Sequence, residues 1–393
     1  MRLKTNSETL VMKVILSIDP VHFPLTGIGR YTFELARHLK EIEAIEQLRF
    51  LSGYRFAPLS EQMHSAQLTV LPARRFRRRV LKSPLTIELY SRVSPLLKQV
   101  ALRGYADHVY HGPNFYLPPF KGPSVCTFHD LSIFTWAHCH PPERVKYMRK
   151  EIVKTLKRAD MLITDTETTR QEVATYFGWP LDKIRAVPLG CSEEFRPRSM
   201  DELTPLLTKY ALSSQGYSLY VGTIEPRKNL EVLLDAYALL PQAVKQQWPL
   251  VLIGYKGWRS EQLHARIEKA VKEGWAHYLG FVEANDLPLI YAGARVFVFP
   301  SLYEGFGLPV LEAMASGVPV VCSNSSTLPE VTGDAAAMCE AQDVEALSEL
   351  INGALQDENW RKQAICKGLI QAAKFSWQRC AEETAQVYKE VLS

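Results

Sequence analysis

Residues 295–330 read RVFVFPSLYEGFGLPVLEAMASGVPVVCSNSSTLPE and carry the strongest structural pattern in the chain. The apolar run 296–299, which is β-branched and aromatic, predicts a strand buried on both faces of a parallel sheet. A loop with two glycines follows, and Pro309 stands where a first helical residue would lie. A helix over 308–315 and a second buried strand over 318–322 complete the predicted unit. The loop therefore lies at a carboxyl end of the sheet, where ligands bind in open α/β folds.

Two carboxylates, Glu304 and Glu312, bracket this loop with seven residues between them. Each also has a structural interpretation, because the helix dipole favours an acid near a helix N-terminus and an acid in a loop can be solvated. The string EGFGLPVLEAMASGVPVV resembles the E-x7-E element of retaining glycosyltransferases of family 4, which have the two-domain GT-B fold. The resemblance implies that Glu304 contacts the donor sugar and Glu312 the ribose of the nucleotide. It also implies donor-binding roles for Gly305, Phe306, Gly307 and Leu308.

The 393 residues of the chain suffice for two domains of ordinary size, and its hydrophobic (47%) and charged (22%) fractions are those of a soluble globular protein. No apolar run approaches the roughly 20 residues that span a bilayer, and we find no cleavable signal pattern, so we expect a cytoplasmic protein. The seven cysteines form no C-x-x-C pair, which fits reduced thiols.

Charge is distributed unevenly along the chain. Residues 1–196 carry a net charge of +10 and the remaining residues one of −6, within the total of +4. The densest basic cluster is 74–82, RRFRRRVLK, and a second basic run lies along 144–158. Such clusters suit an anionic membrane surface or nucleic acid, but a solvated face explains the pattern equally well.

Strand-like and helix-like segments alternate in the first half, which predicts a parallel sheet. After a strand over 13–18, the loop 20–30 contains Gly27 and Gly29 and opens a helix over 31–39. Such a loop offers backbone N–H groups to an anion. It is a weak dinucleotide fingerprint, because Thr32 occupies the third glycine position. In family 4 a glycine-rich loop here lines the cleft near the acceptor and the diphosphate, so the resemblance assigns Gly27 and Gly29 to the donor site.

Two histidines are candidate site residues because each is expected just after a strand. His111 is most simply a core histidine. His129 and Asp130 belong to an F-H-D string that resembles the family motif whose histidine lies beside the donor sugar. The resemblance implies that His129 stabilises the oxocarbenium-like centre or orients the sugar. An alternative is a zinc site made of Cys126, His129, Cys139 and His140, although the spacing is irregular.

The segment 188–218 is rich in turn formers and charges, which predicts a linker between two domains over 1–197 and 198–375. A second strand-helix series follows the linker. A terminal helix commonly crosses back to the first domain in GT-B enzymes, so we expect 376–393 to pack there. The predicted fold class is α/β, with two Rossmann-like domains facing one another across a cleft.

Residues 222–229, GTIEPRKN, follow the first strand of the second domain. Arg227 and Lys228 precede a helix that Asn229 is predicted to cap, so two cations and free backbone donors converge on one anion site. The string resembles the family closely, which adds Thr223 to the donor site. We expect Arg227 and Lys228 to stabilise the leaving diphosphate without a metal, since the chain has no Asp-x-Asp motif.

The resemblance implies a retaining glycosyltransferase with no cofactor and no metal. The best match is a mannosyl- or rhamnosyltransferase of lipopolysaccharide O-chain assembly. It would use GDP-mannose or GDP-rhamnose and a polyprenyl-diphosphate-linked saccharide, peripherally on the inner face of the cell membrane. Three alternatives share the predicted fold. They are a glycosyltransferase that uses a UDP-sugar, a sugar-nucleotide epimerase and a phosphorylase. A dehydrogenase is disfavoured by the broken glycine fingerprint, and a nucleic-acid-binding protein by the paired acids facing the cleft.

Overall fold

The computed structural model describes residues 11–25, 27–59 and 84–393. The basic cluster 74–82 lies outside the described residues. Within the described part, no helix combines the length and the apolar composition that crossing a bilayer demands.

The first sheet has the strand order β3-β2-β1-β4-β5-β6-β7, and only the short β3 runs antiparallel to its neighbour. Its strands are β1 (Met12–Ser17), β2 (Ile45–Ser52), β3 (Arg55–Phe56), β4 (Val109–Gly112), β5 (Ser124–Phe128), β6 (Met161–Thr164) and β7 (Ile184–Ala186). The helices between them are α1 (Gly27–His38), α3 (Pro84–Ala101), α4 (Ser132–Thr135), α5 (Pro142–Leu156) and α6 (Glu167–Phe177). Strands β4, β5 and β6 are buried along their whole length, because helices cover both faces of the sheet.

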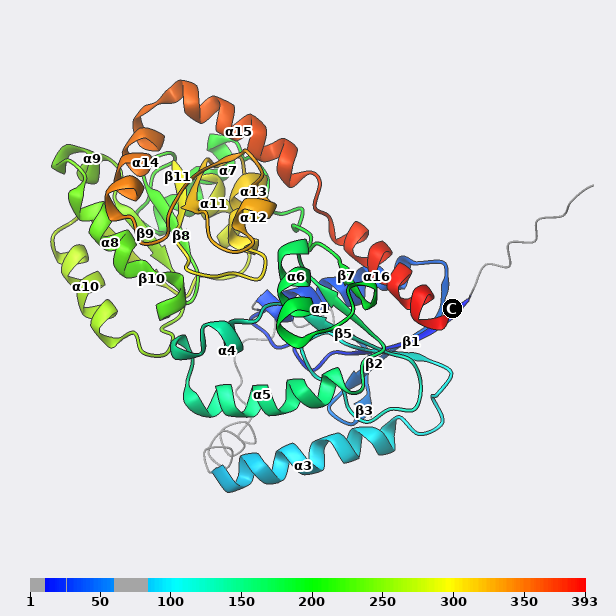
Figure 1. The fold of residues 1–393 in the computed structure, drawn as a ribbon. Coiled ribbons are helices and arrows are strands. Elements are labelled where there is room, and N and C mark those ends of the chain that lie inside the picture. Colours follow the sequence, from blue (N-terminus) through cyan, green and yellow to red (C-terminus); the bar gives the residue numbers. More distant parts are fainter. Residues whose placement is uncertain (1–10, 26, 60–83) are drawn as a thin grey trace, which may run out of the picture.

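The second sheet is parallel throughout, in the order β10-β9-β8-β11-β12-β13. Its strands are β8 (Ser218–Val221), β9 (Leu250–Ile253), β10 (Ala276–Gly280), β11 (Val296–Phe299), β12 (Val320–Ser323) and β13 (Ala336–Cys339). The accompanying helices are α7 (Met200–Lys209), α8 (Leu230–Leu239), α9 (Gln242–Gln247), α10 (Glu261–Lys272), α11 (Leu287–Ala292), α12 (Leu308–Ala315), α13 (Leu328–Thr332), α14 (Val344–Gln356) and α15 (Glu358–Ala372). The two sheets form separate lobes (Figure 1).

Both sheets reverse their strand order once, between β1 and β4 and between β8 and β11. Helices that leave on opposite faces at such a point open a crevice at the carboxyl ends of the strands. In the second domain this crevice lies between the loops 222–229 and 300–307, which carry the two strongest sequence motifs. The topology therefore brings together motifs that lie more than 70 residues apart.

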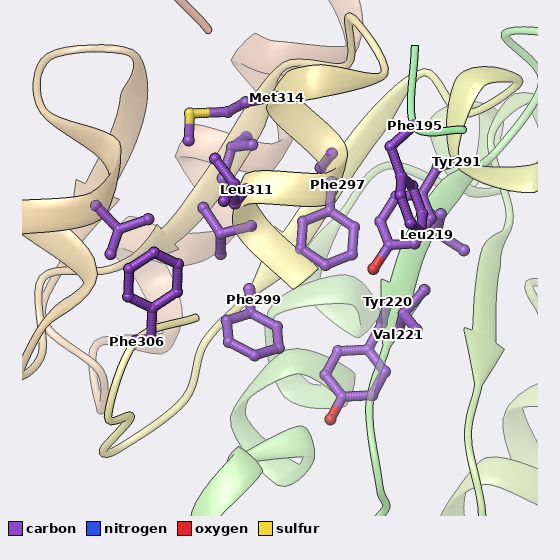
Figure 2. Close-up of a cluster of buried hydrophobic side chains, with 14 of the residues drawn as sticks. Phe195, Leu219, Tyr220, Val221, Tyr291, Phe297, Phe299, Phe306, Leu311 and Met314 are labelled. Carbon is purple, nitrogen blue, oxygen red and sulfur yellow. The ribbon is translucent and has the colours of Figure 1, made fainter. Parts of the chain in front are cut away.

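The core of the second domain holds the motif loop in place. Phe297 and Phe299 on β11 are buried, and the Phe299 ring stacks on Tyr220 of β8 at 6.1 Å between centroids. Figure 2 shows these rings beside Leu311 of α12. Phe195, from the segment that joins the domains, packs edge-on against Tyr291 of α11 at 5.4 Å. The short strand β11 is thus fixed on every side, so the loop after it starts from a rigid base.

Helix α16 (Trp377–Leu392) leaves the second domain and packs on α1, β4, β5 and β6 of the first (Figure 1). Trp377, Cys380 and Tyr388 on its inner face are buried. The Tyr388 hydroxyl lies 2.7 Å from His111 Nδ1, and Arg185 pairs with Glu390 at 2.8 Å. The helix is therefore part of the first domain's core.

The structure corrects three expectations from the sequence. Helix α1 begins at Gly27, so Gly27 and Gly29 lie in its first turn and not in the preceding loop. A side chain at Gly29 would place its Cβ 2.9 Å from the Pro20 carbonyl oxygen, which explains the glycine. His111 lies within β4, where burial lowers its pKa to about 3. The linker 188–218 contains α7, which begins with a capping box of Ser199 and Glu202.

Candidate functional site

The candidate site lies where the loop after β11 meets the loop after β5. A Cβ atom on Gly305 would lie 1.9 Å from the carbonyl oxygen of His129, so only glycine permits this approach. Thr166 and Thr169 at the start of α6 direct their hydroxyls to the Gly305 carbonyl, each at 3.4 Å. The glycine loop of the second domain is thus in direct contact with the F-H-D segment of the first.

A buried ion cluster joins the two motifs of the second domain. Lys228 Nζ lies 2.6 Å from Glu304 Oε1, and Arg227 Nη1 lies 3.2 Å from Glu304 Oε2. The other arm of Arg227 binds Glu225 at 2.8 Å. Burial alone would favour a neutral Glu304, but Lys228 and Arg227 outweigh it and lower the pKa of Glu304 to about 2. Glu304 is therefore a carboxylate at every physiological pH.

The local geometry differs from the expectation at two points. Arg227 and Lys228, which were expected to converge on a bound anion, bind Glu304 directly. Asn229 does not cap α8: it has a φ of 58° and ends the 3₁₀ turn Pro226–Lys228. Its side-chain amide donates to the carbonyls of Pro300, at 2.9 Å, and Ala341. Asn229 thus ties the cationic turn to the end of β11.

His129 is buried and both of its ring nitrogens face acceptors. Nδ1 lies 2.8 Å from Asp165 Oδ2, and Nε2 lies 2.9 Å from the Pro113 carbonyl oxygen. Both contacts are hydrogen bonds only if the imidazole carries two protons. Burial opposes this charge, but Asp165 outweighs it and the pKa of His129 is raised. The two contacts and the raised pKa thus favour the doubly protonated form of this ring, beside Gly305.

Glu312, in the first turns of α12, has a different environment from Glu304. It is buried with no direct cationic partner among the described residues, and burial raises its pKa to about 7 although Arg30 opposes the shift. The two acids of the E-x7-E element therefore ionise far apart in pH. This separation is typical of paired carboxylates with distinct roles in one site.

Contacts between the domains surround this centre. Glu330 of α13 accepts hydrogen bonds from the backbone N–H groups of Glu167 (2.7 Å) and Thr168 (2.9 Å) at the start of α6. The Tyr303 hydroxyl donates to Glu172 Oε2 at 2.5 Å and accepts from the Leu131 N–H at 3.1 Å. The structure therefore shows the two domains closed on one another.

Two cavities open between the domains. One, of about 610 Å³, is lined by Arg149 and Lys146 of the first domain and Arg259 of the second, with His138 and His140. The other, of about 410 Å³, is lined by Trp136 and Tyr303 with polar side chains from both domains. They lie on either side of the segment 135–140.

Several residues of this region were not predicted from the sequence. Asp165, which holds His129, stands 36 residues away in the chain. Tyr255 and Phe281 follow Gly254 and Gly280 at the ends of β9 and β10, and their rings stack at 5.1 Å while staying 43% and 50% exposed. An aromatic residue directly after each of these glycines was the available signal.

The other predicted site residues are spread around the same crevice. Thr223 follows β8, Phe306 is buried in the loop, and Gly307, with a φ of 104°, precedes α12 at Leu308. Cys126 is buried within β5, and no group of three metal-ligating side chains is assembled among the described residues, so the alternative zinc site is not formed there.

Solved structures with the same architecture cover nearly the whole chain. HepE of Anabaena, solved with UDP and glucose, superimposes with a TM-score of 0.69 over 96% of this chain and 99% of its own, at 16% identity. WaaG, a glycosyltransferase involved in lipopolysaccharide biosynthesis, gives 0.68 over 95% and 99%, also at 16% identity. The fold is therefore that of the GT-B glycosyltransferases.

Family models match both halves. Residues 25–195 match the model described as Glycosyltransferase Family 4, and residues 209–370 the model Glycosyl transferases group 1. The O-antigen chain mannosyltransferase B of Escherichia coli is 46% identical over 96% of this chain and 100% of its own length. The serotype-specific mannosyltransferase WbdA of Escherichia coli is 35% identical over 70% of this chain and 34% of its own length. The chain belongs to glycosyltransferase family 4, and it is a glycosyltransferase, as its motifs indicated.

Proposed function

We propose that this enzyme is a retaining mannosyltransferase that takes mannose from GDP-mannose and adds it to a lipid-linked saccharide during O-antigen assembly. The observation that carries the proposal is the Glu304, Arg227 and Lys228 cluster at the β8/β11 crevice, in a chain 46% identical to an O-antigen chain mannosyltransferase. GDP-rhamnose is the alternative donor of the same class.

The cluster suits the chemistry of a nucleotide-sugar. The glycosidic C1–O bond breaks, and its electron pair goes to the departing diphosphate. Arg227 and Lys228 stabilise the charge that develops there, in a site from which closed domains exclude water. The acceptor hydroxyl oxygen bonds to C1, and its proton passes to the departing phosphate. Glu304 keeps Arg227 and Lys228 in position and accepts hydrogen bonds from the donor sugar.

His129 and Glu312 complete the proposed donor site. His129 is held rigidly by Asp165 and the Pro113 carbonyl beside the Gly305 backbone, and in this proposal it positions that loop against the transferred sugar. Glu312 accepts hydrogen bonds from the ribose hydroxyls. The first turn of α1, which contains Gly27 and Gly29, faces the diphosphate. The exposed Tyr255 and Phe281 rings, at the ends of β9 and β10, offer a stacking surface for the base. Each part of the donor, namely base, ribose, diphosphate and sugar, therefore has its own contact residues in this proposal.

The membrane-facing part of the proposal rests on α3. Its exposed apolar residues Val93, Leu96, Leu97 and Val100 recur at helical spacing, so they form one stripe. In the chain this helix directly follows the basic cluster 74–82. An apolar stripe beside basic residues suits the surface of an anionic bilayer, where a polyprenyl-linked acceptor resides.

Transfer from a panel of nucleotide-sugars tests the proposal. We expect the purified enzyme to transfer from GDP-mannose onto a lipid-linked saccharide, to form an α-linkage by NMR, and to be unaffected by UDP-glucose. EDTA should leave the rate unchanged, because Arg227 and Lys228 supply the charge that a metal would supply. Transfer from UDP-glucose alone, or an inverted linkage, would refute the proposed donor and stereochemistry. Complete loss with EDTA, restored by magnesium, would refute the metal-free chemistry.

A further inference from the structure

The cavity of about 410 Å³ between the domains lies outside the donor residues named above. We propose that it is a saccharide subsite that holds a neutral hexose unit of the acceptor against Trp136. The inference rests on the proposed glycosyl transfer and adds to it the place and the chemistry of acceptor recognition.

Aromatic rings form one wall of this cavity. The Trp136 and Tyr303 rings lie 6.3 Å apart with planes tilted by 33°, and both residues line the cavity. Trp136 is partly exposed, and its indole N–H has no hydrogen-bond partner among the described residues. The C–H face of a pyranose packs on such rings, while a free indole N–H can donate to one of its hydroxyls.

Glu172 and Glu340 also line the cavity, and each is held by a hydrogen bond to one of its two carboxyl oxygens. Glu172 Oε2 accepts from the Tyr303 hydroxyl at 2.5 Å, and Glu340 Oε1 accepts from Asn324 Nδ2 at 2.5 Å. No described residue donates to the second oxygen of either carboxylate. Oriented carboxylate oxygens accept from adjacent sugar hydroxyls, and charge-assisted hydrogen bonds of this kind are stronger than neutral ones.

The two cavities differ in the charge of the residues that line them. Among the described residues, those that line it include no lysine, arginine or histidine. The cavity of about 610 Å³ beyond the segment 135–140 is lined by Lys146, Arg149 and Arg259. The described lining thus offers a phosphate no cationic partner, so the smaller cavity fits an uncharged polyol.

Two residues that line the cavity, Ser326 and Tyr303, contact residues of the proposed donor site. Ser326 lines it, and the Ser326 hydroxyl accepts a hydrogen bond of 2.8 Å from the Glu304 N–H. Tyr303 directly precedes Glu304, and its carbonyl accepts from Arg227. The cavity is therefore lined by Tyr303, the residue directly before the acid assigned to the donor sugar, and by Ser326, which binds the backbone of that acid. Residues from both domains line the cavity, so domain closure completes it.

Binding of α-linked mannobiose, measured by ligand-detected NMR in the presence of GDP, tests the subsite. We expect Trp136→Ala to weaken mannobiose binding about tenfold or more and Trp136→Phe to retain most of it, because the ring face supplies the contact. Glu340→Gln, at an exposed position, should weaken binding severalfold. Tyr54→Ala, which removes an exposed aromatic ring far from the cavity, is the matched control and should bind as the unchanged protein does.

Thermal stabilisation by GDP is measured on the same variants and reports on the proposed donor site. If GDP stabilises all of them but Trp136→Ala and Glu340→Gln bind mannobiose normally, the subsite is wrong and the proposed function stands. Equal loss of binding in Trp136→Ala and Tyr54→Ala also overturns the subsite. Absence of any GDP effect in the unchanged protein contradicts the proposed function itself.

Discussion

Glu304 neutralises two buried cations, so we expect it to be needed for stability as well as for turnover. Glu304→Ala leaves Lys228 and Arg227 without their shared partner, and breaking a buried ion pair costs about 3 kcal/mol or more. Turnover should fall about 10²-fold or more, as for other lost electrostatic groups. Denaturant unfolding and initial rates measure the two effects.

Glu304→Gln separates those two effects, because it keeps the side-chain shape and one hydrogen-bond acceptor. It should unfold closer to the unchanged protein than Glu304→Ala does, yet remain slow. Lys228→Ala should be similarly slow. Normal turnover by both Glu304→Gln and Lys228→Ala would remove these residues from the reaction.

His129 provides a pH-dependent test, since Asp165 keeps its imidazole charged. The pKa of His129 is raised in the folded protein. The ion pair therefore contributes its full stability at a pH below the unfolded-state pKa of about 6.5, and this contribution is lost as the pH rises through the folded-state pKa. In Asp165→Asn the main group that opposes burial is lost and only Pro113 and Asp130 still favour the charge, so that pKa falls. We expect turnover about tenfold lower at pH 7.5 and a partial recovery towards pH 5.5.

The shape of the rate profile decides whether Asp165 positions a charged His129. A uniform loss at every pH would indicate a packing role only, and an unchanged profile would show that His129 does not act as an imidazolium. The Tyr31 ring, which packs edge-on against His129 at 5.0 Å, is present in both the unchanged protein and Asp165→Asn, so it does not cause a difference between their profiles.

At the level of single elements, α3 carries a testable surface. Replacing Leu96, Leu97 and Val100 by serine removes most of the exposed stripe, and the lost apolar area weakens insertion into a bilayer surface. We expect at least fivefold weaker binding to anionic vesicles in a sedimentation assay. Neutralising Arg75, Arg77, Arg78 and Arg79 should weaken it further, at roughly 1 kcal/mol for each charge near the surface.

Turnover on a soluble short-chain acceptor should barely change in these α3 variants, because the helix lies outside the donor site. A useful comparison is Ile370→Ser, an exposed apolar residue on α15 that lies in the other domain. Vesicle binding that is equal in all the proteins would show that the stripe and the basic cluster are solvated faces.

Elements buried on both sides were the ones that the sequence predicted best. The bounds of β11 and α12 agree with those expected, because short apolar runs between glycine and proline leave little choice of register. Helices α14 and α15 were not predicted. The domain boundary at 197 remains a prediction, although the strands on either side of it belong to different sheets.

The sequence named candidate site residues but not their contacts, and the roles of these residues remain predictions. Motif strings identified Glu304 and Lys228, but their contact joins positions 76 residues apart, which no local pattern encodes. The expected cap at Asn229 was wrong because the 3₁₀ turn before it changes the backbone direction. The acceptor cavity could not be predicted, since residues of both domains form it only after closure.

For the whole molecule, Glu330 is the contact through which closure can be tested. Its carboxylate accepts from two backbone N–H groups of α6 across the domain boundary, and we expect Glu330→Ala to shift the equilibrium towards the open form by about 1 kcal/mol. Small-angle scattering should show a larger radius of gyration. Glu345→Ala, an exposed acid at the start of α14, is the control. Identical scattering from both variants would show that closure does not depend on Glu330.

Helix α16 also constrains the order of events during biosynthesis. The first domain leaves the ribosome early, yet Trp377, Cys380 and Tyr388 of its core are synthesised only after the entire second domain. Until then the groove on α1, β4, β5 and β6 exposes apolar surface, and His111 lacks its Tyr388 partner. The nascent first domain is therefore an incomplete, aggregation-prone intermediate that would need chaperone protection during translation, while the second domain can complete its own sheet first.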